Sequence, residues 1–183
     1  MIIGIDPGLT RCGYAVFSTA EGVAEVGVFS TDPQDPQEVR LLQQFDELSM
    51  LFDNYSSAQK VVIERPFLTK SNPDTGFGTA QVAGVAMILA AQRDIPVQLL
   101  TPAQVKLAVT GSGTAQKAQI VAALKLRLKI NHLPKPYDAS DALAIALAGS
   151  MQQSVVVDSN FEQTAAQKLW SNALQGKKTE RLM

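Results

Sequence analysis

The sequence predicts an α/β domain built on a mixed five-stranded sheet with helices on both faces. The chain has 183 residues, of which 46% are hydrophobic and 18% are charged, and this is enough for one domain with one core. Short apolar runs bounded by turn residues predict strands, and apolar residues three to four positions apart predict helices. These segments follow one another as three strands, a helix, a strand, a helix, a strand and then further helices.

Five strands follow from local patterning. Residues 1–6 (MIIGID) form a short apolar run that Pro7-Gly8 ends, which is typical of a buried strand. Turn residues 19–22 join the next two strands, as in an antiparallel meander. The fourth strand, KVVIE, is apolar on both faces and is therefore expected to be central. The predicted strands cover residues 1–6, 13–18, 23–30, 60–64 and 96–100.

Helices are expected between and after the strands. Apolar residues from Val39 to Leu51 repeat at a helical spacing. Thr101-Pro102 supplies an N-cap and a first helical residue, and Gly111 ends the short helix that follows. The predicted helices cover residues 38–52, 79–93, 102–110, 114–127 and 137–148.

Composition excludes several classes of protein. No apolar run reaches the roughly 18 to 20 residues that span a bilayer, and the start MIIGIDPG lacks the basic segment of a secretory signal. The single cysteine, Cys12, cannot form an internal disulfide. We therefore expect a cytoplasmic protein with one domain over residues 1–150, followed by a C-terminal helix and a flexible tail over residues 151–183.

Charge is unevenly distributed along a chain whose net charge is −1. Between Asp94 and Asp138 there is no acidic residue, whereas six bases occur there. Such a basic segment indicates either a surface that faces a polyanion or a solvated helix face, and charge alone does not decide between them. The six bases are Lys106, Lys117, Lys125, Arg127, Lys129 and Lys135.

Four acidic residues stand where a catalytic cleft is expected. Asp6 ends the first strand, Glu64 ends the fourth, and Asp138 and Asp141 share a face at the start of the last helix. Strand ends and helix starts in such a sheet meet at one edge. Carboxylates gathered there repel one another unless cations neutralise them, and their hard oxygen atoms suit Mg²⁺ or Mn²⁺. Two ions held in this way are typical of phosphoryl-transfer enzymes.

Each acid also has an interpretation without catalysis. Asp6 precedes Pro-Gly and fits a turn, and Glu64 fits a charge that ends a strand. Asp138 fits an N-cap, which stabilises a helix by roughly 1 kcal/mol. Asp141 is harder to explain in this way, because the residues around it are apolar.

Three segments carry a family resemblance. GIDPGLTRCGYAVF, VVIERPF and YDASDALAIALA resemble the RuvC-type Holliday junction resolvases in order and spacing over about residues 1–150. The resemblance implies a ribonuclease-H-like fold and a homodimeric, metal-dependent endonuclease of recombination and repair that nicks opposed strands of a four-way DNA junction. It also implies two Mg²⁺ or Mn²⁺ ions per site and, as partners, a junction-binding tetramer and a branch-migration ATPase of the RuvA and RuvB type. The implied metal ligands are Asp6, Glu64, Asp138 and Asp141.

The resemblance extends to DNA-binding positions. Phe67 matches an aromatic residue that stacks near the junction centre, although a loop aromatic packed on the core is the alternative. Lys106 and Lys117 match basic residues of DNA contact and catalysis, with a surface lysine as the alternative for Lys106. Lys70 is expected among the DNA contacts. Lys117 falls in the first turn of its helix, where the helix dipole disfavours a cation and a bound phosphate would offset that cost.

The sequence departs from the family at two places that bear on DNA affinity. Arg65-Pro66 follows Glu64 where most relatives have glutamine, and Ala83 replaces an expected arginine. The helix over residues 79–91 is nevertheless expected at a dimer interface, because small residues along it allow close approach. Those residues are Ala80, Ala83, Gly84 and Ala86.

Three other functions remain open from the sequence. One is a junction-binding module with weak or lost catalysis, which the intact acids oppose. A second is a related ribonuclease-H-like nuclease that acts on RNA, which the acids do not separate from a DNA nuclease. The third is an actin-like or sugar-kinase-like ATPase, since GIDPGLT is similar to their phosphate loop, but 183 residues leave little room for the second lobe.

Overall fold

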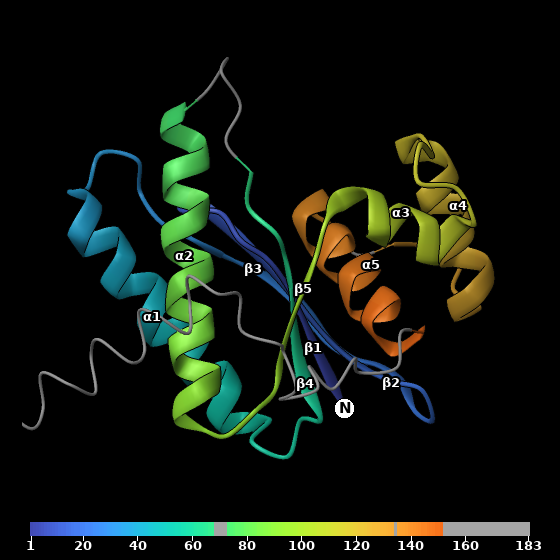
Figure 1. Cartoon of the computed structure of the whole chain (residues 1–183), viewed down its shortest axis with the longest axis horizontal. Coiled ribbons are helices and arrows are strands. Elements are labelled where there is room, and N and C mark those ends of the chain that lie inside the picture. Colours follow the sequence, from blue (N-terminus) through green and yellow to red (C-terminus); the bar gives the residue numbers. More distant parts are fainter. Residues whose placement is uncertain (68–72, 134, 152–183) are drawn as a thin grey trace, which may run out of the picture. The chain divides into compact units, whose positions relative to one another are not determined.

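The computed structural model describes residues 1–67, 73–133 and 135–151 and confirms the mixed five-stranded sheet (Figure 1). The strand order is β3-β2-β1-β4-β5, so β1 and β4 both lie inside the sheet. β1 pairs with β2 antiparallel and with β4 parallel; β2 and β3 are antiparallel, and β4 and β5 are parallel. The strands are β1 (Ile2–Asp6), β2 (Arg11–Ser18), β3 (Gly22–Ser30), β4 (Lys60–Glu64) and β5 (Val97–Leu100).

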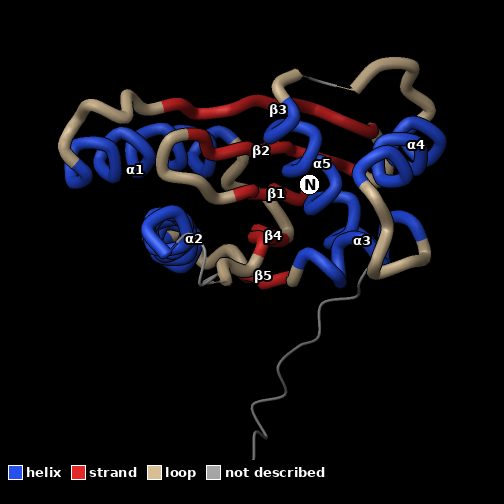
Figure 2. Tube along the Cα trace, turned by 90° about the horizontal axis from the view of Figure 1, so that it is seen from above, coloured by secondary structure: helices blue, strands red, loops and turns tan. Residues whose placement is uncertain are grey.

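Helices cover both faces of the sheet. Figure 2 shows α1 and α2 on one side of the strands and α3, α4 and α5 on the other. Their bounds are α1 (Gln37–Asn54), α2 (Pro73–Gln92), α3 (Pro102–Thr110), α4 (Lys117–Leu128) and α5 (Tyr137–Met151). No helix among the described residues is long and apolar enough to cross a membrane.

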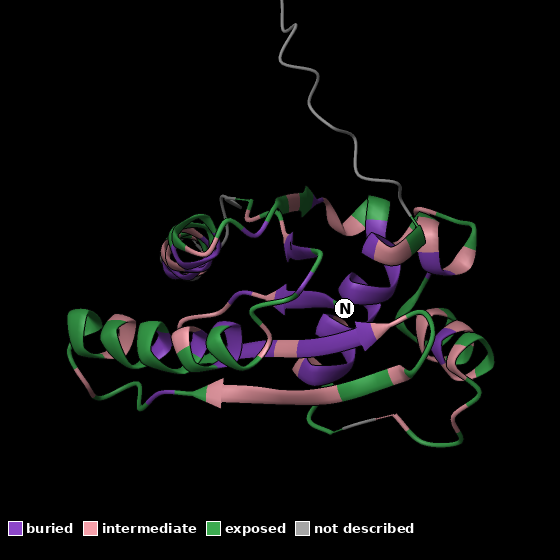
Figure 3. Ribbon diagram, turned by 90° about the horizontal axis from the view of Figure 1, so that it is seen from below, coloured by how far each residue is buried: buried purple, intermediate pink, exposed green. Residues whose placement is uncertain are grey.

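The sheet separates two hydrophobic clusters. One contains Ile3, Ile5 and residues of α1 and α2, and the other contains Val62 and most of the apolar side of α5. The central strands and α5 are consequently the most buried parts of the fold, as Figure 3 shows. Cys12 belongs to the first cluster and is fully buried, as expected of a small core residue.

Helix α5 lies unusually close to the sheet because two strand positions are glycine. A methyl group at Gly4 would lie within 3 Å of the backbone nitrogen of Ala146, and one at Gly13 would collide with the backbone of Asp138. Gly13 is paired across β1 and β2 with Asp6. The two glycines therefore let the first turn of α5 approach the end of β1.

Some predicted boundaries are wrong. α2 begins at Pro73, six residues before the predicted start. Pro73 indicated a loop, but proline is also common in the first turn of a helix. α4 begins at Lys117 rather than residue 114, since a turn from Ser112 to Ala115 precedes it. β2 begins at Arg11, two residues before the predicted start at residue 13. The predicted C-terminal helix lies outside the described residues.

Candidate active site

The four predicted acids converge at one edge of the sheet. Asp6 and Glu64 end β1 and β4, which are adjacent and parallel, with Ile5 paired to Ile63 just before them. Asp138 and Asp141 lie on the first turns of α5, which the close packing on β1 and β2 carries to the same edge. All four residues are partly exposed, so none of them is sealed in the core.

A cavity of about 270 Å³ opens between these elements. Three of the acids line it, namely Asp6, Glu64 and Asp141, and so do Lys106 of α3 and Lys117 of α4. Asp138 does not line the cavity. The recess therefore brings three carboxylates and two ammonium groups together from five different elements, with apolar residues of α3, α4 and α5 completing its wall.

Electrostatic repulsion within the cluster is strongest at Asp6. The pKa of Asp6 is raised from 3.8 to about 7, mainly by burial and then by the negative charges of Glu64, Asp141 and Asp138 in that order. Lys117 opposes this effect only weakly. The pKa of Glu64 is raised mainly by burial and then by Asp141, while Lys106 lowers it. The site therefore concentrates negative charge that its two lysines do not balance.

The two acids of α5 are each paired with a base. Arg11 at the start of β2 approaches Asp138 Oδ2 at 2.7 Å from one terminal nitrogen and donates a hydrogen bond to it from Nε at 2.9 Å. The Nζ atom of Lys117 lies 3.2 Å from Asp141 Oδ2. Among the described residues, no group of three or more Asp, Glu, His or Cys side chains is arranged to hold a metal ion as the side chains stand.

The basic residues of the site are positioned by helix ends. A capping box between Thr101 and Gln104 fixes the start of α3, and Lys106 follows within that helix. Lys117, which was expected in the first turn, is the first residue of α4, and its ammonium group also lies 4.8 Å from the ring centroid of Tyr137. A cation at a helix N-terminus is unfavourable by itself, and both the carboxylate and the ring offset this cost.

Sequence reasoning missed two residues of the site, Arg11 and Tyr137. Arg11 is 127 positions away from its partner Asp138, and nothing in the local pattern links them. Tyr137 stands directly before Asp138, and an exposed aromatic residue at the start of an otherwise apolar helix was the available signal.

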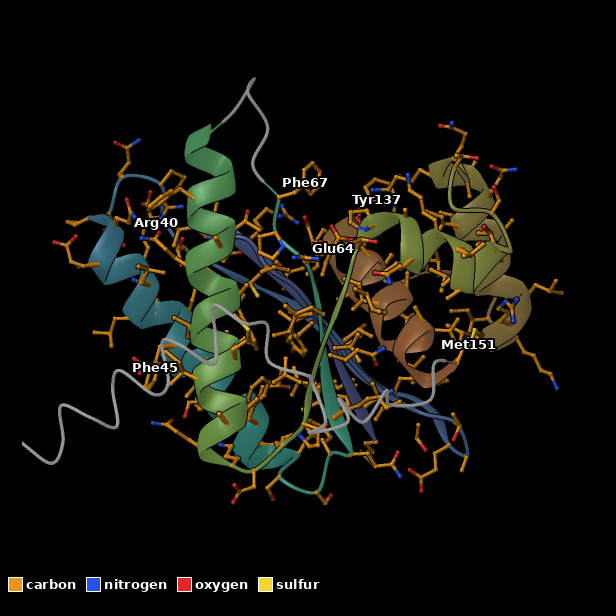
Figure 4. All side chains as sticks on the ribbon, in the orientation of Figure 1. Arg40, Phe45, Glu64, Phe67, Tyr137 and Met151 are labelled. Atoms are coloured by element: carbon orange, nitrogen blue, oxygen red, sulfur yellow. The ribbon has the colours of Figure 1, made fainter. Side chains whose placement is uncertain are left out.

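The loop after β4 presents Phe67 to solvent. Its side chain is 62% exposed, so the alternative in which Phe67 packs on the core is wrong. In Figure 4, Phe67, Glu64 and Tyr137 lie toward the same end of the molecule. Lys70 lies outside the described residues.

The small residues predicted to form a dimer contact do not share one face of α2. Ala83 and Ala86 are almost fully buried in the chain's own core, which corrects the prediction for these two. Ala80 is exposed, and space is open beside Gly84. Small residues suit both the face of a helix that packs on its own core and a face that packs on a second copy. Residue size alone therefore does not distinguish these two faces.

Comparison with known proteins finds one family consistently. The family model described as crossover junction endodeoxyribonuclease RuvC matches residues 2–149. The RuvC protein of Bifidobacterium longum (strain DJO10A) is 40% identical over 189 aligned positions, which cover 100% of this chain and 96% of that protein. The RuvC protein of Leifsonia xyli subsp. xyli is 47% identical over 150 positions, or 80% of this chain and 71% of that protein.

Solved structures agree with the sequence comparison. T. thermophilus RuvC in complex with a Holliday junction substrate matches with a TM-score of 0.73 and 27% identity. The match covers 82% of this chain and 92% of the T. thermophilus chain.

Proposed function

The chain belongs to the RuvC family of crossover junction endodeoxyribonucleases, and we propose that its carboxylate recess is where it cuts four-way DNA junctions. The observation that carries this proposal is the convergence of Asp6, Glu64, Asp138 and Asp141 at the carboxyl ends of β1 and β4. We further propose that two divalent ions, Mg²⁺ or Mn²⁺, serve the reaction. Such an enzyme acts in recombination and repair, and we infer that it works in the cytoplasm.

The residues of the recess fit divalent cations chemically. Every acidic group there offers hard oxygen atoms, which Mg²⁺ and Mn²⁺ prefer. The raised pKa of Asp6 reflects both burial and the nearness of the other carboxylates, and a divalent charge would relieve the repulsion. We expect Asp138 and Asp141 to exchange Arg11 and Lys117 for the ions. Ions held by Asp6, Glu64, Asp138 and Asp141 would supply Lewis acidity for the attack of water and for the charge on the leaving 3′ oxygen.

The chain's own residues orient the substrate. Lys106 and Lys117 line the same cavity as the acids, so a phosphodiester that enters it meets two ammonium groups beside the carboxylates. Lys117, released from Asp141, would neutralise charge that develops on the phosphate. Phe67 is exposed at the same end of the molecule and is free to stack on an unpaired base, which contributes about 1–3 kcal/mol.

Paired nicks require paired sites, and α2 offers a surface for a second copy. Phe77 and Ile88 are 63% and 60% exposed on this helix, with Ala80 and Gly84 between them. Exposed apolar residues in a row are typical of a protein interface. We propose that a second copy packs on this face with two-fold symmetry, which would match the paired scissile strands of a junction.

Cleavage of a synthetic, immobile four-way junction tests the proposal. We expect symmetric nicks near the junction in Mg²⁺ or Mn²⁺, no nicks in EDTA and no cleavage of linear duplex. Asp6→Asn should bind the junction without cutting it, and Asp46→Asn, an exposed acid of α1, should cut normally. Binding without cutting by the wild-type chain, over several junction sequences and both metals, would favour a binding module instead.

A further inference from the structure

Cleavage at the carboxylate recess does not by itself require the contact between Lys117 and the ring of Tyr137. We propose that Tyr137 is a positioning residue for Lys117, whose ammonium group it keeps at the recess when Asp141 is engaged by a metal ion. This inference rests on the proposed function, because it concerns how the chain presents Lys117 to the scissile phosphate.

Lys117 lies between two partners of different chemistry. Its Nζ atom is 3.2 Å from Asp141 Oδ2 and 4.8 Å from the centre of the Tyr137 ring. Its side chain is 58% exposed, and among the described residues only Asp141 and Tyr137 hold its ammonium group by an ion pair, a hydrogen bond or a ring contact. Each partner therefore restricts a side chain that would otherwise sample many rotamers.

Both partners attract the ammonium group of Lys117, but only Asp141 carries a negative charge that offsets it. Asp141 neutralises the ammonium group, and the same oxygen atoms are needed for metal binding. An aromatic ring attracts a cation through its quadrupole but carries no net charge, and it does not compete for Mg²⁺. Tyr137 can therefore keep Lys117 in place while leaving its positive charge available to a phosphate.

Most of the Tyr137 side chain lies outside the hydrophobic core. Its side chain is 63% exposed, and its hydroxyl group makes no hydrogen bond with any other described residue. It is the first residue of α5, immediately before Asp138, so the close packing of this helix on the sheet places ring and carboxylates together. Figure 4 shows Tyr137 in the same part of the molecule as Glu64, whereas Phe45 lies far away on α1.

A double-mutant cycle tests the proposal through catalysis. Single-turnover cleavage at saturating junction should fall about two- to five-fold in Tyr137→Leu, the range expected for an exposed cation–π contact. Tyr137→Phe should cleave at the wild-type rate, because the ring and not the hydroxyl acts. In a Lys117→Ala background, Tyr137→Leu should cause no further loss. Phe45→Leu is the matched control for removal of an exposed aromatic ring.

A second readout needs neither metal nor DNA. With ¹³C-labelled lysine in EDTA, the ε-methylene resonance of Lys117, assigned by its loss in Lys117→Ala, should be shifted upfield by the ring current. The shift should persist in Tyr137→Phe and disappear in Tyr137→Leu.

Any one of three results would overturn the inference. Tyr137→Leu could lower the cleavage rate equally with and without Lys117, or Tyr137→Phe could cleave as slowly as Tyr137→Leu. The third is an ε-methylene chemical shift of Lys117 that is the same in the wild-type chain and in Tyr137→Leu. Failure of the wild-type chain to cut junctions would refute the proposed function instead, while the resonance would still decide whether the ring holds Lys117.

Discussion

Replacing Asp6 by asparagine removes a carboxylate whose ionisation opposes folding, so we expect Asp6→Asn to be more stable than the wild-type chain in the absence of metal. Asparagine has nearly the same shape but cannot ionise. The raised pKa of Asp6 means that the native state holds its proton up to about pH 7, whereas the unfolded chain releases it near pH 3.8. The wild-type chain therefore loses stability as pH rises between these values.

The size of the effect follows from the difference between the two pKa values. They are 3.8 and about 7, and each pH unit between them corresponds to about 1.4 kcal/mol. The raised pKa of Asp6 therefore destabilises the fold by about 4 kcal/mol at pH 8 but by only about 1.5 kcal/mol at pH 5. The stability of Asp6→Asn relative to wild type should rise by about 2–3 kcal/mol over this range and level off above pH 7.

Urea unfolding in EDTA at pH 5, 6, 7 and 8 measures this difference. Any constant cost of burying the asparagine amide shifts all four values equally, so the slope with pH is diagnostic. Asp46→Asn, at an exposed position of α1, is the matched control for the change from aspartate to asparagine. A difference between Asp6→Asn and wild type that is independent of pH, or that falls as pH rises, would refute the account of the cluster.

Four further predictions, one of them with a control variant, test the fold and the site. Gly4→Ala should destabilise the protein by about 1–3 kcal/mol in urea unfolding, because its methyl group meets the backbone of α5. Ile88→Glu should give a monomer by sedimentation, whereas Leu126→Glu, at an 81% exposed position of α4, should not change the assembly. Lys117→Ala should lower both cleavage rate and junction affinity, and an unchanged rate at saturating DNA would leave it only a binding role. Glu64→Gln should abolish cleavage but keep junction binding, and retained turnover would remove it from the site.

The sheet and the acids at its edge could be predicted because local patterns determine them. The run KVVIE is a strand whose end is fixed by Arg65-Pro66, and the spacing of Asp138 and Asp141 places them on one helix face. The predicted fold class is confirmed by the sheet order and by the solved RuvC structures.

Other features depend on tertiary contacts that no local pattern contains. The pairing of Arg11 with Asp138 joins segments 127 positions apart. The pairing of Lys117 with Asp141 depends on how α4 packs on α3, which in turn packs on α5. The inward orientation of Ala83 follows from the packing of α2 against the sheet. Residue type indicated a small side chain there but not the surface that it faces.

Binding of Mn²⁺ to the protein, followed by electron paramagnetic resonance, tests most directly whether the four carboxylates form the metal site. We predict two ions per wild-type chain, reduced affinity in Asp6→Asn and in Glu64→Gln, and unchanged binding in Asp46→Asn. Equal stoichiometry and affinity in the wild-type chain and both site variants would contradict the assignment of the recess as the catalytic metal centre.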